Sequence, residues 1–146
     1  MAVNQELQDR NGKGTEKFVS KTLKKFGYWA YNMPPKVNGQ PCDVVGAKGG
    51  KRTIVWLVDA KHVEVDKISF TFDRIEANQI SSMAYAIQFA KINAENVGFA
   101  IFFERTKVLY WFSYSKFLKY SQLGYKSISL HELETFEEVL ENADNN

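Results

Sequence analysis

Cysteine is almost absent from this 146-residue sequence, in which Cys42 stands alone. A single cysteine excludes an internal disulfide framework, and it excludes zinc sites built from several cysteines. Long hydrophobic runs are also missing, because the longest apolar stretches, such as residues 97–103, are far too short to span a membrane. The N-terminal residues lack the apolar segment of a secretory signal. We therefore expect a protein of a reducing, cytoplasmic compartment.

Positive charge is missing from the C-terminal part of the chain. Residues 131–146 contain six acidic residues and neither lysine nor arginine, so the first 130 residues hold all 19 basic residues and 11 of the 17 acidic ones. A basic body with an acidic tail indicates a polyanionic partner. A solvated surface of the ordinary kind gives the same pattern, so charge alone leaves both interpretations open.

The remaining composition is that of a globular protein, with 45% hydrophobic and 14% aromatic residues. We find no internal repeat and no linker. The chain is long enough for one sizeable core, so we expect a single domain over residues 1–146. Within it, we expect residues 1–13 to be a flexible N-terminus and residues 142–146 to be a polar tail.

Hydrophobic periodicity predicts an alternation of helices and strands. A helix is expected over residues 14–26, capped by Thr15 and ended by Gly27. Strands are expected at 28–33, 42–47, 52–61, 97–104 and 107–114, loops or short strands at 34–41 and 67–75, and helices at 76–93, 115–124 and 131–146. Gly49 and Gly50 predict a tight hairpin between the second and third strands. This order predicts an α/β fold with a mixed sheet flanked by helices.

An acid and a base stand two residues apart at the end of the apolar run 54–58. Asp59 and Lys61 share one face of the predicted strand, because side chains alternate along a strand. The hairpin brings Asp43 alongside, so two carboxylates and an ammonium group converge at one end of the sheet. Two close carboxylates attract a hard divalent cation such as Mg²⁺, which activates water and stabilises charge on a scissile phosphate. A neighbouring lysine orients the water or holds the phosphate.

A buried or edge salt bridge is the simpler interpretation of an isolated Asp-x-Lys pattern. Asp43, placed by the hairpin beside that pattern, favours a site that hydrolyses phosphodiester bonds. Both interpretations remain open from the residues alone.

The same residues resemble a known family of nucleases. Pro41-Cys42-Asp43, followed across the glycine hairpin by Asp59-Ala60-Lys61, resembles the motif of the PD-(D/E)XK nucleases, and residues 14–31 look like the first helix of that superfamily. The order of features over residues 14–133 is most similar to that of the RecU-type Holliday junction resolvases of bacteria. The further matching segments are residues 69–72, Gln79, residues 97–103 and residues 108–113.

The resemblance implies a restriction-endonuclease-like core and a homodimeric, Mg²⁺-dependent nuclease that nicks four-way DNA junctions symmetrically, with Mn²⁺ as a substitute metal. It implies that Glu16, Asp43 and Asp59 bind the metal. It also implies that Lys61 and Gln79 complete the catalytic set, and that the protein acts in a bacterial cell or a phage-infected host.

The sequence departs from that family at four places. Asp59 stands where the family usually has glutamate, Cys42 separates Pro41 from Asp43, and Asn78 replaces a histidine before Gln79. The long insertion that forms a stalk in the RecU type is reduced to about residues 32–41. Because that stalk is linked to junction recognition, other DNA substrates stay open, including restriction-like, repair and flap-type cleavage.

Basic residues crowd the first helix and the hairpin, and we expect some of them to contact DNA phosphates. The expected contacts are Lys13, Lys17, Lys21, Lys48, Lys51 and Arg52. A catalytically silent DNA-binding module, and a structural protein with only a salt bridge at residues 59 and 61, are the alternatives from other functional classes.

Most aromatic residues are expected to fill the core. For Tyr28, Trp29 and Tyr31, stacking on an opened base is the alternative to core packing.

Overall fold

The computed structural model describes residues 2–34 and 42–144, with side chains from residue 14 onward. Within that part, the main sheet consists of β1 (Trp29–Asn32), β2 (Val44–Lys48), β3 (Ile54–Val63), β5 (Val97–Phe103), β6 (Val108–Ser113) and β8 (Glu134–Thr135), in this spatial order. A small second sheet pairs β4 (Ser69–Thr71) with β7 (Ser127–Ser129). The helices are α1 (Ala2–Lys25), α2 (Ala77–Ala90), α3 (Tyr114–Gln122) and α4 (Phe136–Asp144).

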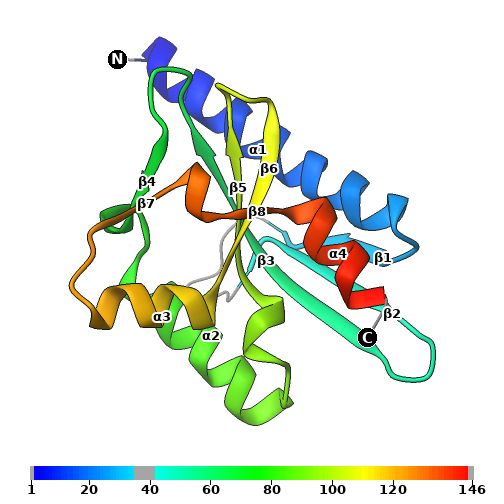
Figure 1. Cartoon of the computed structure of the whole chain (residues 1–146). Helices are drawn as coiled ribbons and strands as arrows, with labels where there is room; N and C mark the ends of the chain where they lie inside the picture. Colours follow the sequence, from blue (N-terminus) through cyan, green and yellow to red (C-terminus); the bar gives the residue numbers. More distant parts are fainter. Residues whose placement is uncertain (1, 35–41, 145–146) are drawn as a thin grey trace.

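The main sheet is mixed, as expected. β3 and β5 run parallel, whereas the other neighbouring strands pair antiparallel. A parallel pair needs a long crossover between its strands, and α2 lies in that crossover. The predicted α/β class, with a mixed sheet flanked by helices, is therefore confirmed (Figure 1).

Each face of the sheet carries its own hydrophobic cluster, because side chains alternate along β3. Trp56, Val58 and Ala60 point to the face covered by α1 and α4. Leu57 and Val63 point to the other face, where α2 and α3 contribute apolar side chains. Figure 1 shows these two helices together on one side of the sheet. Asp59 and Lys61 follow the parity of Leu57, so the candidate site lies on the face of α2 and α3.

Several element boundaries differ from the predicted ones. α1 begins at Ala2 rather than at residue 14, so Thr15 lies inside the helix, where it is buried, and does not cap it. Gly27 ends the helix as predicted, with a φ of +87° that residues with a side chain rarely adopt. The predicted loop at 34–41 lies outside the described residues apart from Pro34.

The C-terminal part of the chain also differs from the prediction of one helix over residues 131–146. A 3-10 turn and β8 come first, and α4 begins only at Phe136. The reason is local: the hydroxyl of Thr135 accepts a hydrogen bond from the N–H of Glu138, which caps the helix start.

The tryptophans are not all in the core. Trp56 and Trp111 are 1% and 6% exposed and contact each other edge to face, as expected. Tyr28 is also buried. Trp29 and Tyr31 are 61% and 50% exposed, so the expectation that they pack in the core is wrong. β1 is one of the two edge strands of the main sheet, and among the described residues its main packing partners are β2 and α1.

No helix in the described ranges combines the length and the apolar character needed to cross a membrane.

The close approach of β5 and β6 gives a stability prediction. A Cβ added to Gly98 would lie 2.4 Å from the carbonyl oxygen of Phe112, so Gly98→Ala requires the strands to move apart. We expect a loss of about 2–3 kcal/mol in the free energy of unfolding, measured by urea denaturation. Gly14→Ala is the matched control, since its Cβ meets nothing within 4 Å and alanine favours the helix. Equal stability of the two variants would contradict this account of Gly98.

Candidate active site

Asp59 and Lys61 form a buried ion pair near the C-terminal end of β3. The ammonium nitrogen of Lys61 lies 3.1 Å from Oδ2 of Asp59, and the two side chains are 14% and 5% exposed. The two residues share one face of the strand, as their spacing predicted. Exposed ion pairs contribute little, but water is largely excluded from this one, so its charges interact strongly.

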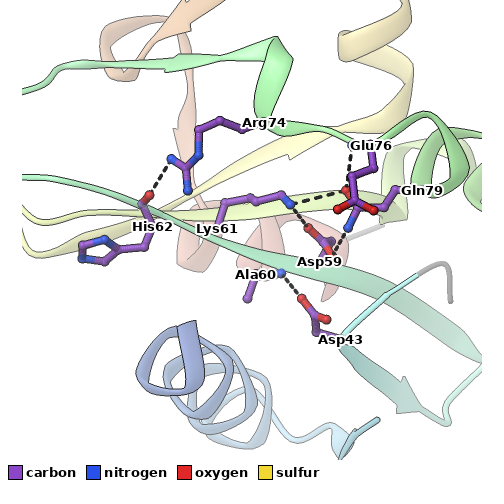
Figure 2. A network of polar contacts seen from close by, with 8 residues as sticks. All are labelled: Asp43, Asp59, Ala60, Lys61, His62, Arg74, Glu76 and Gln79. Atoms are coloured by element: carbon purple, nitrogen blue, oxygen red, sulfur yellow. Dashed lines mark hydrogen bonds and ion pairs between the residues drawn. The ribbon is translucent and has the colours of Figure 1, made fainter. Parts of the chain in front are cut away.

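Asp43 lies opposite Asp59, just before β2 begins. Val44 pairs with Val58, and the N–H of Asp43 donates to the carbonyl oxygen of the same Val58 at 2.9 Å, so Asp43 is held against β3 at the end of the ladder. Oδ2 of Asp43 accepts a hydrogen bond from the N–H of Ala60 at 2.9 Å (Figure 2). The hairpin therefore brings the two aspartates to one place, as predicted.

Gln79 connects the first turn of α2 to this pair. Its Nε2 donates to Oδ1 of Asp59 at 3.0 Å, and its Oε1 accepts from Lys61 at 3.4 Å and from the N–H of Glu76 at 3.2 Å (Figure 2). The bond to Glu76 belongs to a capping box, in which the residues at the helix start satisfy each other's backbone groups. One side chain thus fixes the helix start and orients both members of the ion pair.

Burial makes the charge of Asp59 costly. It raises the pKa of Asp59 to about 7; Lys61 lowers that pKa, whereas the nearby carboxyl of Asp43 raises it further. Oδ2 of Asp59 is buried, and the ion pair with Lys61 does not give it a hydrogen bond of good geometry. A buried and under-satisfied carboxylate beside a second carboxylate fits a bound divalent cation, which would supply the missing positive charge.

Asp43 and Asp59 are the residues that could hold such a cation, with waters completing its shell. In residues 2–34 and 42–144, no three aspartate, glutamate, histidine or cysteine side chains gather closely enough to hold a metal ion. Glu16 therefore does not form a three-ligand group with the two aspartates. It is half-buried on α1, and α1 covers the face of β3 opposite to Asp59.

Cys42, next to Asp43, is a poor metal ligand. It is 2% exposed, and burial raises the pKa of its thiol to about 12, so the thiolate that metals bind is not available at neutral pH. It packs in the cluster on the α2 face as a small core residue.

The expected DNA contacts do not form one patch with the site. Lys48 donates to the carbonyl oxygen of Phe26 at 2.8 Å and pairs with Asp144 at 3.0 Å, so it joins the ends of α1 and α4. Lys51 and Arg52 are exposed at the hairpin turn. Asp59 lies five residues beyond the start of β3, about 17 Å along the strand from that turn.

The lysines of α1 are placed differently. Lys17 and Lys21 are exposed on the helix, whereas the side chain of Lys13 lies outside the described residues. A role of the exposed lysines in DNA contact stays a prediction.

Sequence reasoning missed Arg74 and Glu76. Arg74 donates to the carbonyl oxygen of His62 at 2.6 Å, and its guanidinium lies on the same side of β3 as Lys61 (Figure 2). Glu76 precedes α2 and takes part in the capping box with Gln79. The spacing of Glu76 and Gln79, three residues apart before an apolar helix, was a usable signal for the box.

No family model and no curated protein matches the sequence. Among solved structures, the chain is similar to Hjc of Archaeoglobus fulgidus, a Holliday junction resolvase from an archaeal hyperthermophile. The TM-score is 0.58 at 17% identity, and the match covers 88% of this chain and 94% of that one. A likeness at this identity shows the fold, and it confirms the predicted restriction-endonuclease-like core.

The raised pKa of Asp59 predicts how stability changes with pH. An unfolded aspartate titrates near pH 4, and Asp59 in the folded chain near pH 7. Between these values the folded state binds more protons, so stability falls as pH rises from 4 to 7 and then levels off. Asp59→Asn removes this fall. Between pH 4 and pH 8, the free energy of unfolding of the variant should therefore rise by about 2–4 kcal/mol relative to that of the wild type.

The measurement is urea unfolding of both proteins across pH 4–8 in the presence of a chelator. Asp73→Asn, at an exposed position, is the matched control and should follow the wild-type profile. Parallel profiles for wild type and Asp59→Asn would show that the folded structure does not raise the pKa of this carboxyl.

Proposed function

We propose that this chain is a metal-dependent endonuclease that hydrolyses phosphodiester bonds of branched DNA, with the four-way junction as its leading substrate. The observation that carries the proposal is the buried carboxylate of Asp59, held between Lys61 and a second aspartate. The similarity of the fold to that of a Holliday junction resolvase supports the same class of activity.

The proposed roles follow from the contacts. Asp43 and Asp59 would hold Mg²⁺, or Mn²⁺ in its place. The metal would supply a water of lowered pKa and positive charge against the scissile phosphate. Lys61 holds the phosphate or orients the attacking water, since its ammonium lies beside the carboxylate. Gln79 fixes the positions of Asp59 and Lys61 relative to each other.

The electrostatics favour this proposal over a structural salt bridge. In a pair that stabilises the fold, the lysine would lower the pKa of its partner below the usual value. Here burial outweighs Lys61 and the pKa of Asp59 rises, so the charged carboxylate opposes folding. An arrangement that lowers stability is typical of functional sites.

A cleavage assay tests the proposal on a four-way junction, a linear duplex and single-stranded DNA, each with and without Mg²⁺. We expect Mg²⁺-dependent cleavage of the junction. Asp59→Asn and Lys61→Ala should each reduce the rate by about 100-fold or more, because each removes charge from the site where charge develops. Junction binding by these variants should persist.

Gln79→Ala should have a smaller effect, a loss of about tenfold in the cleavage rate. It removes the side chain that orients Asp59 and Lys61 but removes no charge. Asp73→Asn should cut like the wild type. Cleavage of the linear duplex alone would overturn the resolvase assignment, and absence of cleavage with both Mg²⁺ and Mn²⁺ would overturn the nuclease assignment.

Two symmetric nicks require two sites, so we propose a two-fold homodimer. An apolar pair on α2 supports this: Tyr85 and Phe89 are 67% and 64% exposed, and their ring centroids lie 4.7 Å apart. Residues four apart share one face of a helix, and exposed aromatic pairs are typical of interfaces. α2 also carries Gln79, so contact between two copies of α2 would place the two active sites close to the two-fold axis.

The double change Tyr85→Ser and Phe89→Ser should convert the dimer to a monomer, as measured by analytical ultracentrifugation. Neither side chain is in the core, so the variant should unfold at nearly the same urea concentration as the wild type. The control is Leu123→Ser and Tyr125→Ser, which removes a similarly exposed pair after α3. A double α2 variant that stays dimeric would place the interface elsewhere.

A further inference from the structure

Two aromatic rings stand side by side on the outermost strand of the sheet. Trp29 and Tyr31 are two residues apart on β1, and their rings are nearly parallel, with 5.9 Å between centroids and 6° between planes. They are 61% and 50% exposed. Burying one such ring stabilises a protein by roughly 1.5–3 kcal/mol, so leaving two of them exposed needs an explanation other than folding.

The strand register places this pair beside the candidate active site. Tyr31 pairs with Val45, and Val45 lies two residues after Asp43, on the same face of the sheet. The ladder continues past β1, since the N–H of Met33 donates to the carbonyl oxygen of Asp43 at 2.8 Å. Tyr31 and Asp43 are thus diagonal neighbours, about 7–8 Å apart between backbones. The rings share the face of Asp59 and Lys61.

The same face of the sheet carries the charged groups of the candidate site. Lys61 points to it together with Asp59, and Asp43 lies diagonally from Tyr31. The lysines of α1 lie toward the other face, because Asn32, which contacts Ser20 of α1, alternates with Tyr31 along β1. Exposed rings beside a candidate site for phosphodiester cleavage are suited to hold a base of the bound nucleic acid, since bases stack on aromatic side chains.

We infer that the Trp29–Tyr31 pair is a stacking platform for a nucleobase that is unpaired or unstacked from the DNA substrate close to the scissile phosphate. The inference rests on the proposed nuclease function and adds the selection of the substrate to it. Every base has a flat apolar face, so such a platform selects DNA with free bases at a branch over continuous duplex, without selecting a sequence. The position of the rings beside the candidate site for phosphodiester cleavage favours DNA over a protein segment as the occupant.

Tryptophan fluorescence offers a direct test on the full chain. Of the three tryptophans, Trp29 is exposed and the other two are buried, so quenching by a ligand reports on Trp29. The probes are a splayed duplex with unpaired thymines at its fork and a blunt duplex of equal length, both titrated in a chelator to prevent cleavage. We expect quenching by the splayed duplex and about tenfold tighter binding of it than of the blunt duplex.

Trp29→Ala with Tyr31→Ala should lower affinity for the splayed duplex by about tenfold or more and leave affinity for the blunt duplex unchanged. Trp29→Phe should retain most of the preference, because phenylalanine also stacks. Tyr125→Ala is the matched control: it removes a ring that is 55% exposed, in the segment between α3 and β7, and should bind like the wild type. Urea unfolding checks that each variant folds.

Three results would overturn the inference. These are an equal loss of affinity for both probes, unchanged Trp29 fluorescence with the splayed duplex, and quenching that follows protein concentration without DNA, which would make a second copy the occupant. The outcome is separable from that of the proposed function, because binding is measured without cleavage. Junction cleavage without a change in Trp29 fluorescence would contradict only the stacking platform. A change in Trp29 fluorescence in a chain that cuts no DNA would contradict only the proposed nuclease activity.

Discussion

The carboxylate of Asp59 is the group around which the site is organised. Asp59 is 3% exposed on a central strand, where β2 pairs on one side and β5 on the other, so little water reaches it. Lys61 and Gln79 each offer it a contact, yet its pKa still rises because burial dominates. The fold therefore holds a charge that it does not fully neutralise, and a cation is the simplest partner for it.

Two other elements place polar groups beside this carboxylate. The hairpin supplies Asp43, which is itself held by the N–H of Ala60 on the next strand. The first turn of α2 supplies Gln79, whose amide is also part of the helix cap. Backbone pairing and a helix start therefore set the positions of the groups around Asp59. The two hydrophobic clusters on either side of the sheet offset the cost of burying the charge.

The sequence predicted what depends on local pattern. Side chains alternate along a strand, so the spacing of Asp59 and Lys61 predicted that they share one face. The hairpin predicted at Gly49 and Gly50 brought Asp43 next to them. It could not predict features that depend on distant parts of the chain. Lys48 is held by Asp144, 96 residues away, and Glu16 falls on the far face because α1 packs there. β7 and β8 are three and two residues long, too short for a periodic signal.

The exposure of Trp29 and Tyr31 could not be predicted either, because it depends on the order of the strands in the sheet. An aromatic strand is expected in the core, and it is exposed here because β1 is the outermost strand of the sheet. An uncovered edge strand carries a risk of aggregation, and natural proteins usually limit it by charge. The exposed lysines of α1, which packs behind β1, provide charge of that kind at this edge. Under the proposed function, the rings on the open face would contact the substrate, and this would explain how they persist next to the candidate site.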